Sequence, residues 1–152
     1  MKTDLHKILS VSGEPGLFLF ISQASGGVIV EALATKKRGL FGMNARLTSL
    51  SDISIYTKDE EVPLHKILVK MHEILLEEAA PNSKSNPEVL KKFFAEVLPD
   101  YDRDRFYLSH MKKVVDWYNS LKEYATLEFE LAEEKEELAQ EANNKIEDAK
   151  PQ

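Results

Sequence analysis

The sequence predicts an α+β protein in which a small β-rich unit precedes a helical unit. Two apolar runs, Leu17–Ser22 and Val28–Leu33, flank a glycine-containing segment and predict a β-hairpin. After Pro63, apolar residues recur at the three- and four-residue spacing of amphipathic helices. This change of period, from two residues to about 3.6, divides the chain into a sheet-forming part and a helix-forming part.

The hairpin is the strongest strand signal in the chain. Phe, Ile and Val suit the pleated surface of a strand, and Gly26-Gly27 permits the positive φ of a tight reversal. Leu40–Leu47 is a weaker strand candidate that Gly42 interrupts, and Ile53–Thr57 alternates as a half-buried strand does. About four short strands predict an SH3-like barrel or a bent antiparallel sheet covered by the next helix, and both remain open.

Short helical turns are expected at two places in the β-rich unit. Asp4 can cap a short helix over Leu5–Leu9, and Ser49–Asp52 resembles another single turn. Between the first of these and the hairpin, Ser12–Gly16 predicts a turn, because proline fixes φ and glycine permits left-handed backbone.

Three amphipathic helices are predicted, over Pro63–Ala79, Pro87–Leu98 and Ser109–Tyr124. Both prolines suit the first position of a helix, and Ser109 is expected to cap the third one. The third helix should turn one apolar side inward, formed by Met111, Val114, Val115, Tyr118 and Leu121.

These elements predict five consecutive segments. A β-barrel-like domain covers residues 1–60, a connecting helix 61–80 and a linker 81–86. A small helical domain follows over residues 87–125, and an acidic tail, helical or disordered, over 126–152. The linker is assigned from its composition and its lack of periodicity.

Composition excludes several classes of protein. The chain of 152 residues contains no cysteine, which excludes disulfides, thiolate catalysis and cysteine-ligated metals. It shows neither a signal-peptide apolar region nor a run of about 18 apolar residues, so we expect a cytoplasmic protein with no membrane partner. The net charge is −6, and residues 126–152 alone carry nine acidic against three basic residues. That tail argues against a nucleic-acid clamp formed by the whole molecule.

Catalytic and metal-binding motifs are not found. Asp100–Asp104 has acids at the first, third and fifth positions of a calcium loop, but Arg105 stands where glycine is required. His72-Glu73 begins like a zinc-protease helix, but Leu76 replaces the second histidine. We therefore predict no catalytic residues, cofactor or metal, although an enzyme built from dispersed carboxylates stays open.

Two groups of residues are candidates for binding a macromolecule. Lys36, Lys37 and Arg38 form a basic loop, with Phe41 and Arg46 nearby, and such loops on small β-domains bind RNA or DNA.

The second group is aromatic and consists of Phe106, Tyr107 and Trp117. Exposed aromatic residues of this kind commonly anchor protein partners. The favoured prediction is a non-catalytic binding or adaptor protein with a protein partner. Nucleic acid is the alternative, and a homo-oligomer is also open.

Two groups of segments resemble a known family. Leu9–Phe18 with Gly27–Leu33 resembles the start of the bacterial domain-of-unknown-function family 5606. Val97–Arg105, with Lys112-Lys113 and Trp117–Asn119 after it, resembles the helical companion domain of the same proteins. The resemblance spans roughly residues 4–124. It implies a compact two-part cytoplasmic protein, and it brings no activity, ligand or site residues.

Overall fold

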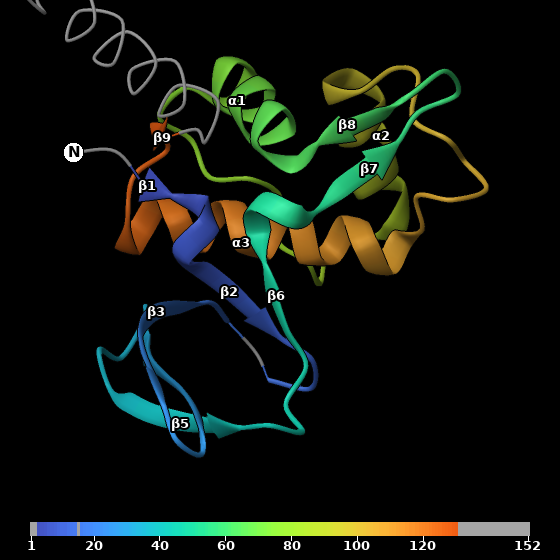
Figure 1. Cartoon of the computed structure of the whole chain (residues 1–152). Helices are drawn as coiled ribbons and strands as arrows, with labels where there is room; N and C mark the ends of the chain where they lie inside the picture. Colours follow the sequence, from blue (N-terminus) through green and yellow to red (C-terminus); the bar gives the residue numbers. More distant parts are fainter. Residues whose placement is uncertain (1–2, 15, 131–152) are drawn as a thin grey trace, which may run out of the picture.

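The structure, a computed structural model, describes residues 3–14 and 16–130 (Figure 1). Its elements follow in the order β1 (Thr3–Asp4), η1 (Leu5–Lys7), β2 (Ile8–Val11), β3 (Phe18–Ala24), β4 (Gly27–Ala32), β5 (Arg38–Gly42), β6 (Leu47–Ser49), η2 (Leu50–Asp52), β7 (Ser54–Tyr56), β8 (Glu61–Pro63), α1 (Leu64–Leu75), α2 (Pro87–Val97), α3 (Leu108–Tyr124) and β9 (Phe129–Glu130). The predicted α+β class is confirmed.

An antiparallel sheet with the strand order β5-β4-β3-β2-β6 forms the N-terminal part. Its centre is the predicted hairpin, in which β3 pairs with β4. A bulge between Phe20 and Ser22 shifts the register, which lets the hairpin bend. A glycine is required at Gly27, because a Cβ there would lie 2.0 Å from the carbonyl oxygen of Phe41. The neighbouring strand thus approaches the hairpin at its turn.

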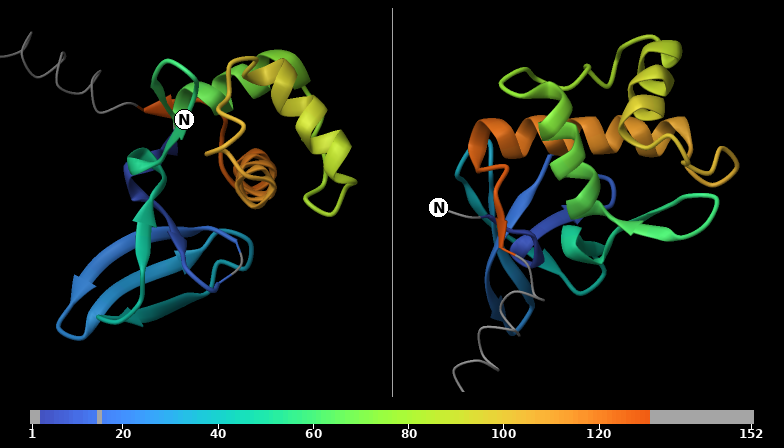
Figure 2. Two further views of the ribbon diagram at one scale, coloured as in Figure 1. Left: turned by 90° about the vertical axis from the view of Figure 1, so that its right-hand side faces the viewer. Right: turned by 90° about the horizontal axis from the view of Figure 1, so that it is seen from above.

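The sheet is strongly curled. Phe18 of β3 and Phe41 of β5 lie on the same face but on strands separated by β4, and their ring centroids are only 5.2 Å apart. Leu9, Val11 and Val30 are buried on this concave face, separately from the main core. The end of the sheet formed by β3, β4 and β5 therefore has a small core of its own and projects away from the helices (Figures 1 and 2).

The SH3-like barrel is not supported, and the bent open sheet is the alternative that the structure bears out. β5 and β6 are the two edges of the sheet and do not pair with each other. β6 has only three residues before the chain turns into η2, which packs against α1. A strand this short, drawn toward the helices, cannot close the sheet against β5.

The main core joins the sheet to the helices. Leu5, Ile8 and Leu50 from the N-terminal part belong to the same buried cluster as the inner sides of all three helices. The largest fully buried side chains in this cluster are Leu50, Leu64, Ile67, Leu68, Met71, Leu90, Phe94, Met111, Tyr118 and Leu121. The inward-facing side predicted for α3 is confirmed, since all five of its residues are buried.

The start and the end of the described chain are held together. β1 pairs in parallel with β9, and the side chain of Thr3 is buried. The hydroxyl of Thr3 donates to the carbonyl of Thr126 at 3.1 Å and accepts from the Thr126 N–H at 3.1 Å. Phe129 then enters the main core. Residues 126–130 of the predicted acidic tail thus pack on the fold, and residues 131–152 lie outside the described part.

Several predicted helix boundaries differ from those in the structure. The helix predicted over Leu5–Leu9 is a single 3-10 turn, because Ile8 and Leu9 pair with β3 as the strand β2. The third helix begins at Leu108, with Tyr107 and not Ser109 at its N-cap. The expected cap by Asp4 is confirmed, since its carboxylate accepts from the His6 N–H at 3.0 Å.

The first long helix ends earlier than predicted, at Leu75 and not at Ala79. Leu76 adopts a positive φ of 55°, which stops the helix, and its side chain is 67% exposed. Four residues later, both the N–H and the carbonyl of Ala80 bond to the side-chain amide of Asn119, at 2.8 and 3.2 Å. This contact with α3 redirects the chain, and the residues of α1 alone could not reveal it.

Other predicted elements are confirmed. α2 begins at Pro87 with Asn86 as N-cap, and β7 lies within the predicted strand Ile53–Thr57. β8, the partner of β7, was not predicted because it has three residues and ends in Pro63. None of the helices in the described part has the length and apolarity needed to cross a membrane.

Leu50→Ala should destabilise the whole fold. Leu50 is fully buried where the sheet meets α1, so we expect a loss of about 2–5 kcal/mol in the free energy of unfolding. Urea unfolding followed by far-UV circular dichroism and by Trp117 fluorescence should give one shared, shifted transition. Val89→Ala, at an exposed position of α2, should change stability by less than about 0.5 kcal/mol. Two separate transitions, with only one shifted by Leu50→Ala, would contradict the shared core.

Leu76→Gly should stabilise the protein by up to about 1 kcal/mol in urea unfolding. Glycine adopts positive φ without strain, and the exposed leucine side chain contributes little burial. Glu77→Gly is the matched control, because Glu77 does not have a positive φ, and it should lose roughly 0.5–1 kcal/mol. Equal effects of the two changes would show that the backbone of Leu76 is not strained.

Tyr118→Phe should leave stability at pH 7 within about 1 kcal/mol of the parent, because the buried Tyr118 hydroxyl has no hydrogen-bond partner in the described structure. Burial raises the pKa of Tyr118. The folded protein therefore keeps this proton above pH 10 while the unfolded chain releases it, so the parent loses stability as pH rises. The free energy of unfolding of Tyr118→Phe, measured relative to that of the parent, should therefore rise between neutral pH and about pH 11. A stability difference between variant and parent that does not change with pH would contradict the raised pKa of Tyr118.

Candidate binding cleft

Two adjoining cavities lie along α3. One has a volume of about 170 Å³ and the other of about 700 Å³, and both are lined by Ile53, Lys113 and Trp117. We call the smaller one the apolar cavity, the larger one the polar cavity, and the two together the α3 cleft. Trp117 and Lys113 come from α3, one turn apart, and Ile53 lies between η2 and β7.

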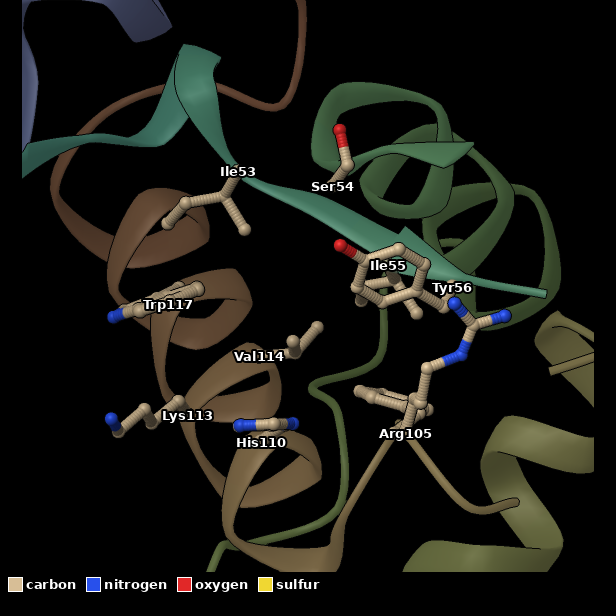
Figure 3. Close-up of a pocket in the computed structure, with 10 residues that line it drawn as sticks. Ile53, Ser54, Ile55, Tyr56, Arg105, His110, Lys113, Val114 and Trp117 are labelled. Carbon is tan, nitrogen blue, oxygen red and sulfur yellow. The ribbon is translucent and has the colours of Figure 1, made fainter. Parts of the chain in front are cut away.

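The apolar cavity is bounded by β7 on one side and by α3 on the other (Figure 3). Ile53, Ile55 and Tyr56 supply the strand side, while Val114 and Trp117 supply the helix side. Val114 and Trp117 are three residues apart and therefore lie on the same side of α3, toward the strand. The result is a small recess with a largely apolar wall.

Arg105 lies beside this cavity in a fixed position. Its Nε donates to a carboxylate oxygen of Asp102 at 2.7 Å, and its guanidinium carbon lies 4.4 Å from the centre of the Tyr56 ring. The Arg105 guanidinium, followed by the N–H of Asp104, holds the pKa of the Asp102 carboxyl below its usual range. Hydrogen bonding to Glu61 raises the pKa of Tyr56. The positive charge of Arg105 is thus already paired within the protein, with the carboxylate of Asp102.

This arrangement also explains the acidic run at Asp100–Asp104. Asp102 accepts from Arg105 and from the backbone of Asp104, so it closes the turn before α3. Among the described residues, no group of three or more acidic or histidine side chains is placed to hold a metal ion.

The polar cavity combines charges of both signs with hydroxyl groups. Arg46, just before β6, and Lys113 of α3 supply the cations, and Glu14 and Asp116 supply the anions. Neither cation forms a salt bridge with another residue of the described structure. The hydroxyl groups belong to Ser10, Ser12, Thr48 and Ser120. The cavity can therefore accept a ligand's polar groups, including a carboxylate.

The residues of the predicted basic loop do not share one surface. Lys36 and Lys37 are exposed in the turn before β5, whereas Arg38 pairs with Glu31 at 3.3 Å. Phe41 packs against Phe18 on the concave face of the sheet. Arg46 lies apart from them and lines the polar cavity.

The three predicted aromatic residues also have different surroundings. Phe106 is buried between the rings of Phe94 and Tyr101, although one part of it reaches the apolar cavity. Tyr107 is 55% exposed at the start of α3. Trp117 is half-buried and borders both cavities. The cleft thus brings Arg46 from one predicted group together with Trp117 from the other.

Sequence reasoning missed Ile53, Lys113 and Asp116 as lining residues of the cleft. Lys113 and Asp116 are ordinary polar positions on the surface of an amphipathic helix, and no spacing distinguishes them. Only the packing of α3 beside β2 and β6 shows that they face the cleft.

Comparisons with known proteins extend over most of the chain. A family model described as a domain of unknown function, DUF5606, matches residues 5–50, and a second, DUF6852, also a domain of unknown function, matches residues 53–121. Neither indicates a catalytic family. No curated protein matches the chain.

A solved structure is similar to this chain: a solution NMR structure of a structural genomics target from Bacteroides vulgatus. It is 39% identical, and the match covers 84% of this chain and 97% of the other, with a TM-score of 0.68. The resemblance predicted from the residues is thereby confirmed, and the chain belongs to the family in which a DUF5606 domain is followed by a DUF6852 domain.

Proposed function

We propose that this protein is a cytoplasmic, non-catalytic binding protein whose α3 cleft holds a segment of a protein partner. The observation that carries the proposal is the position of Trp117, half-buried at the junction of the apolar and polar cavities. Tryptophan at such a position commonly supplies a large part of the binding energy of a protein interface.

The size of the apolar cavity favours a side chain over a whole small molecule. Sites for drug-sized ligands usually have volumes of about 300–1,000 Å³, and this cavity has about 170 Å³. One apolar side chain of a partner can enter between Val114, Trp117 and Ile55. The polar cavity beside it can then accept the backbone and the polar neighbours of that side chain.

The charges of the cleft indicate which polar neighbours fit. Arg46 and Lys113 have no salt-bridge partner in the described structure, so a carboxylate of the partner can pair with them. Glu14 and Asp116 line the same cavity and would repel a densely anionic ligand. This mixture supports a peptide with an isolated acidic residue over the phosphate backbone of a nucleic acid.

Trp117→Ala should abolish most binding at the cleft. Peptides selected from a phage-displayed random library on the full-length protein serve as probes, and their dissociation constants are measured by calorimetry. We expect Trp117→Ala to weaken them at least about tenfold. Trp117 is the single tryptophan of the chain, so its fluorescence should also shift when a peptide binds.

Tyr124→Ala is the matched control, because Tyr124 is an exposed aromatic residue of the same helix that does not line the cleft. Peptides should bind this variant as they bind the parent. Selected peptides that tolerate Trp117→Ala would overturn the proposal. Salt-sensitive binding of a single-stranded RNA that shifts Trp117 fluorescence, with no peptide selected, would favour the nucleic-acid alternative.

A further inference from the structure

The five-stranded sheet has two unlike edges. β6 is three residues long and leads directly into η2, which packs against α1, so that edge is short and covered. β5 is five residues long, lies at the end of the sheet that projects from the helices, and among the described strands pairs with β4 alone (Figure 1). Its outer backbone groups are therefore available to a further strand.

The middle of the exposed edge is apolar and uncharged. Leu40 is 56% exposed in the middle of β5, and Met43, just after it, is 89% exposed. Soluble proteins usually protect such an edge with charged residues, prolines or bulges. The single charge within β5 is that of Arg38, and Glu31 on the neighbouring strand pairs with it at 3.3 Å. The stretch from Gly39 to Met43 therefore lacks the charges and prolines that usually protect an edge.

A second copy of β5 fits this edge in one symmetric register. In an antiparallel pair centred on Leu40, each Leu40 lies opposite the Leu40 of the other copy, and Arg38 lies opposite Gly42. Lys37 then lies opposite Met43, and Lys36 opposite Asn44, so no cation faces a cation. A twofold register centred on Leu40 thus places apolar against apolar side chains at its centre and avoids every contact between like charges.

The side-chain faces support the same register. Pairing with β4 places Leu40 beside Ile29 and Arg38 beside Glu31 on the convex face, opposite to Phe41. The two Leu40 side chains would meet on this face and extend the apolar strip from Ile29. A Cβ at Gly42 meets no atom closer than 3.9 Å, so the position opposite Arg38 is open.

We propose that the protein self-associates through its β5 strands, which pair antiparallel about a twofold axis at Leu40 and join two sheets into one. The partner is a second copy of this chain, and the α3 cleft is not part of the contact. Since a pair of five-residue strands buries less than the roughly 1,200 Å² of a standard interface, the dimer is weak and concentration-dependent.

Sedimentation velocity of the full chain, from about ten to several hundred micromolar, tests this interface. The parent should show a reversible monomer–dimer equilibrium. Leu40→Lys places two ammonium groups opposite each other and should weaken the dimer at least about tenfold. Gly42→Glu places a carboxylate opposite Arg38 of the other copy, twice per dimer, and should strengthen it about two- to tenfold at low salt.

Leu76→Lys is the matched control, since Leu76 is more exposed than Leu40 but lies beyond α1. It should leave the dimer unchanged. Circular dichroism confirms that each variant is folded, and the opposite signs expected for Leu40→Lys and Gly42→Glu exclude a general loss of stability. A parent that stays monomeric at the highest concentration would overturn the proposal. So would equal weakening by Leu40→Lys and Leu76→Lys, or weakening by Gly42→Glu.

Discussion

The burial of Leu5, Ile8 and Leu50 in a core shared with the helices is the constraint on which the rest of the structure depends. These side chains lie at one end of the sheet, so burying them anchors β2 and η2 against α1 while the other end stays free. A fully buried leucine stabilises a fold by a few kcal/mol relative to an exposed one. Several such residues therefore hold the two matched family domains in one arrangement.

The α3 cleft is a consequence of that anchoring. β2 and β6 continue away from the shared core, and their residues Ser10, Val11 and Thr48 face the polar side of α3 across the polar cavity. Because β7 follows η2 at once, Ile53 and Ile55 complete the apolar cavity beside it. The polar cavity needs both matched domains, whereas every residue that lines the apolar cavity belongs to the second one.

The free end of the sheet follows from the same geometry. A curled sheet needs a core on its concave face, and Leu9, Val11 and Val30 supply it with the help of the Phe18–Phe41 pair. At this end of the sheet, the convex side of β5 and its outer edge stay exposed. The two surfaces that we propose for recognition are therefore separate, one along α3 and one at the far end of the sheet.

Elements with a local cause could be predicted from the amino-acid sequence. Asn86-Pro87 begins α2 through a side-chain cap and a fixed φ, and the hairpin forms where Gly26-Gly27 interrupts two β-branched and aromatic runs. The period of α3 alone identified its buried side. These features depend on interactions between residues a few positions apart.

The remaining features could not be predicted in this way, because they depend on contacts between residues far apart in the chain. Ile8 and Leu9 are a strand and not a helix because β3 and β6 pair with them. α1 stops at Leu75 in a fold where Asn119, far along the chain, binds Ala80. Arg46 and Trp117 line the same cleft because the shared core places β6 opposite α3 across the polar cavity. The separation of these two residues in the sequence does not predict that they meet.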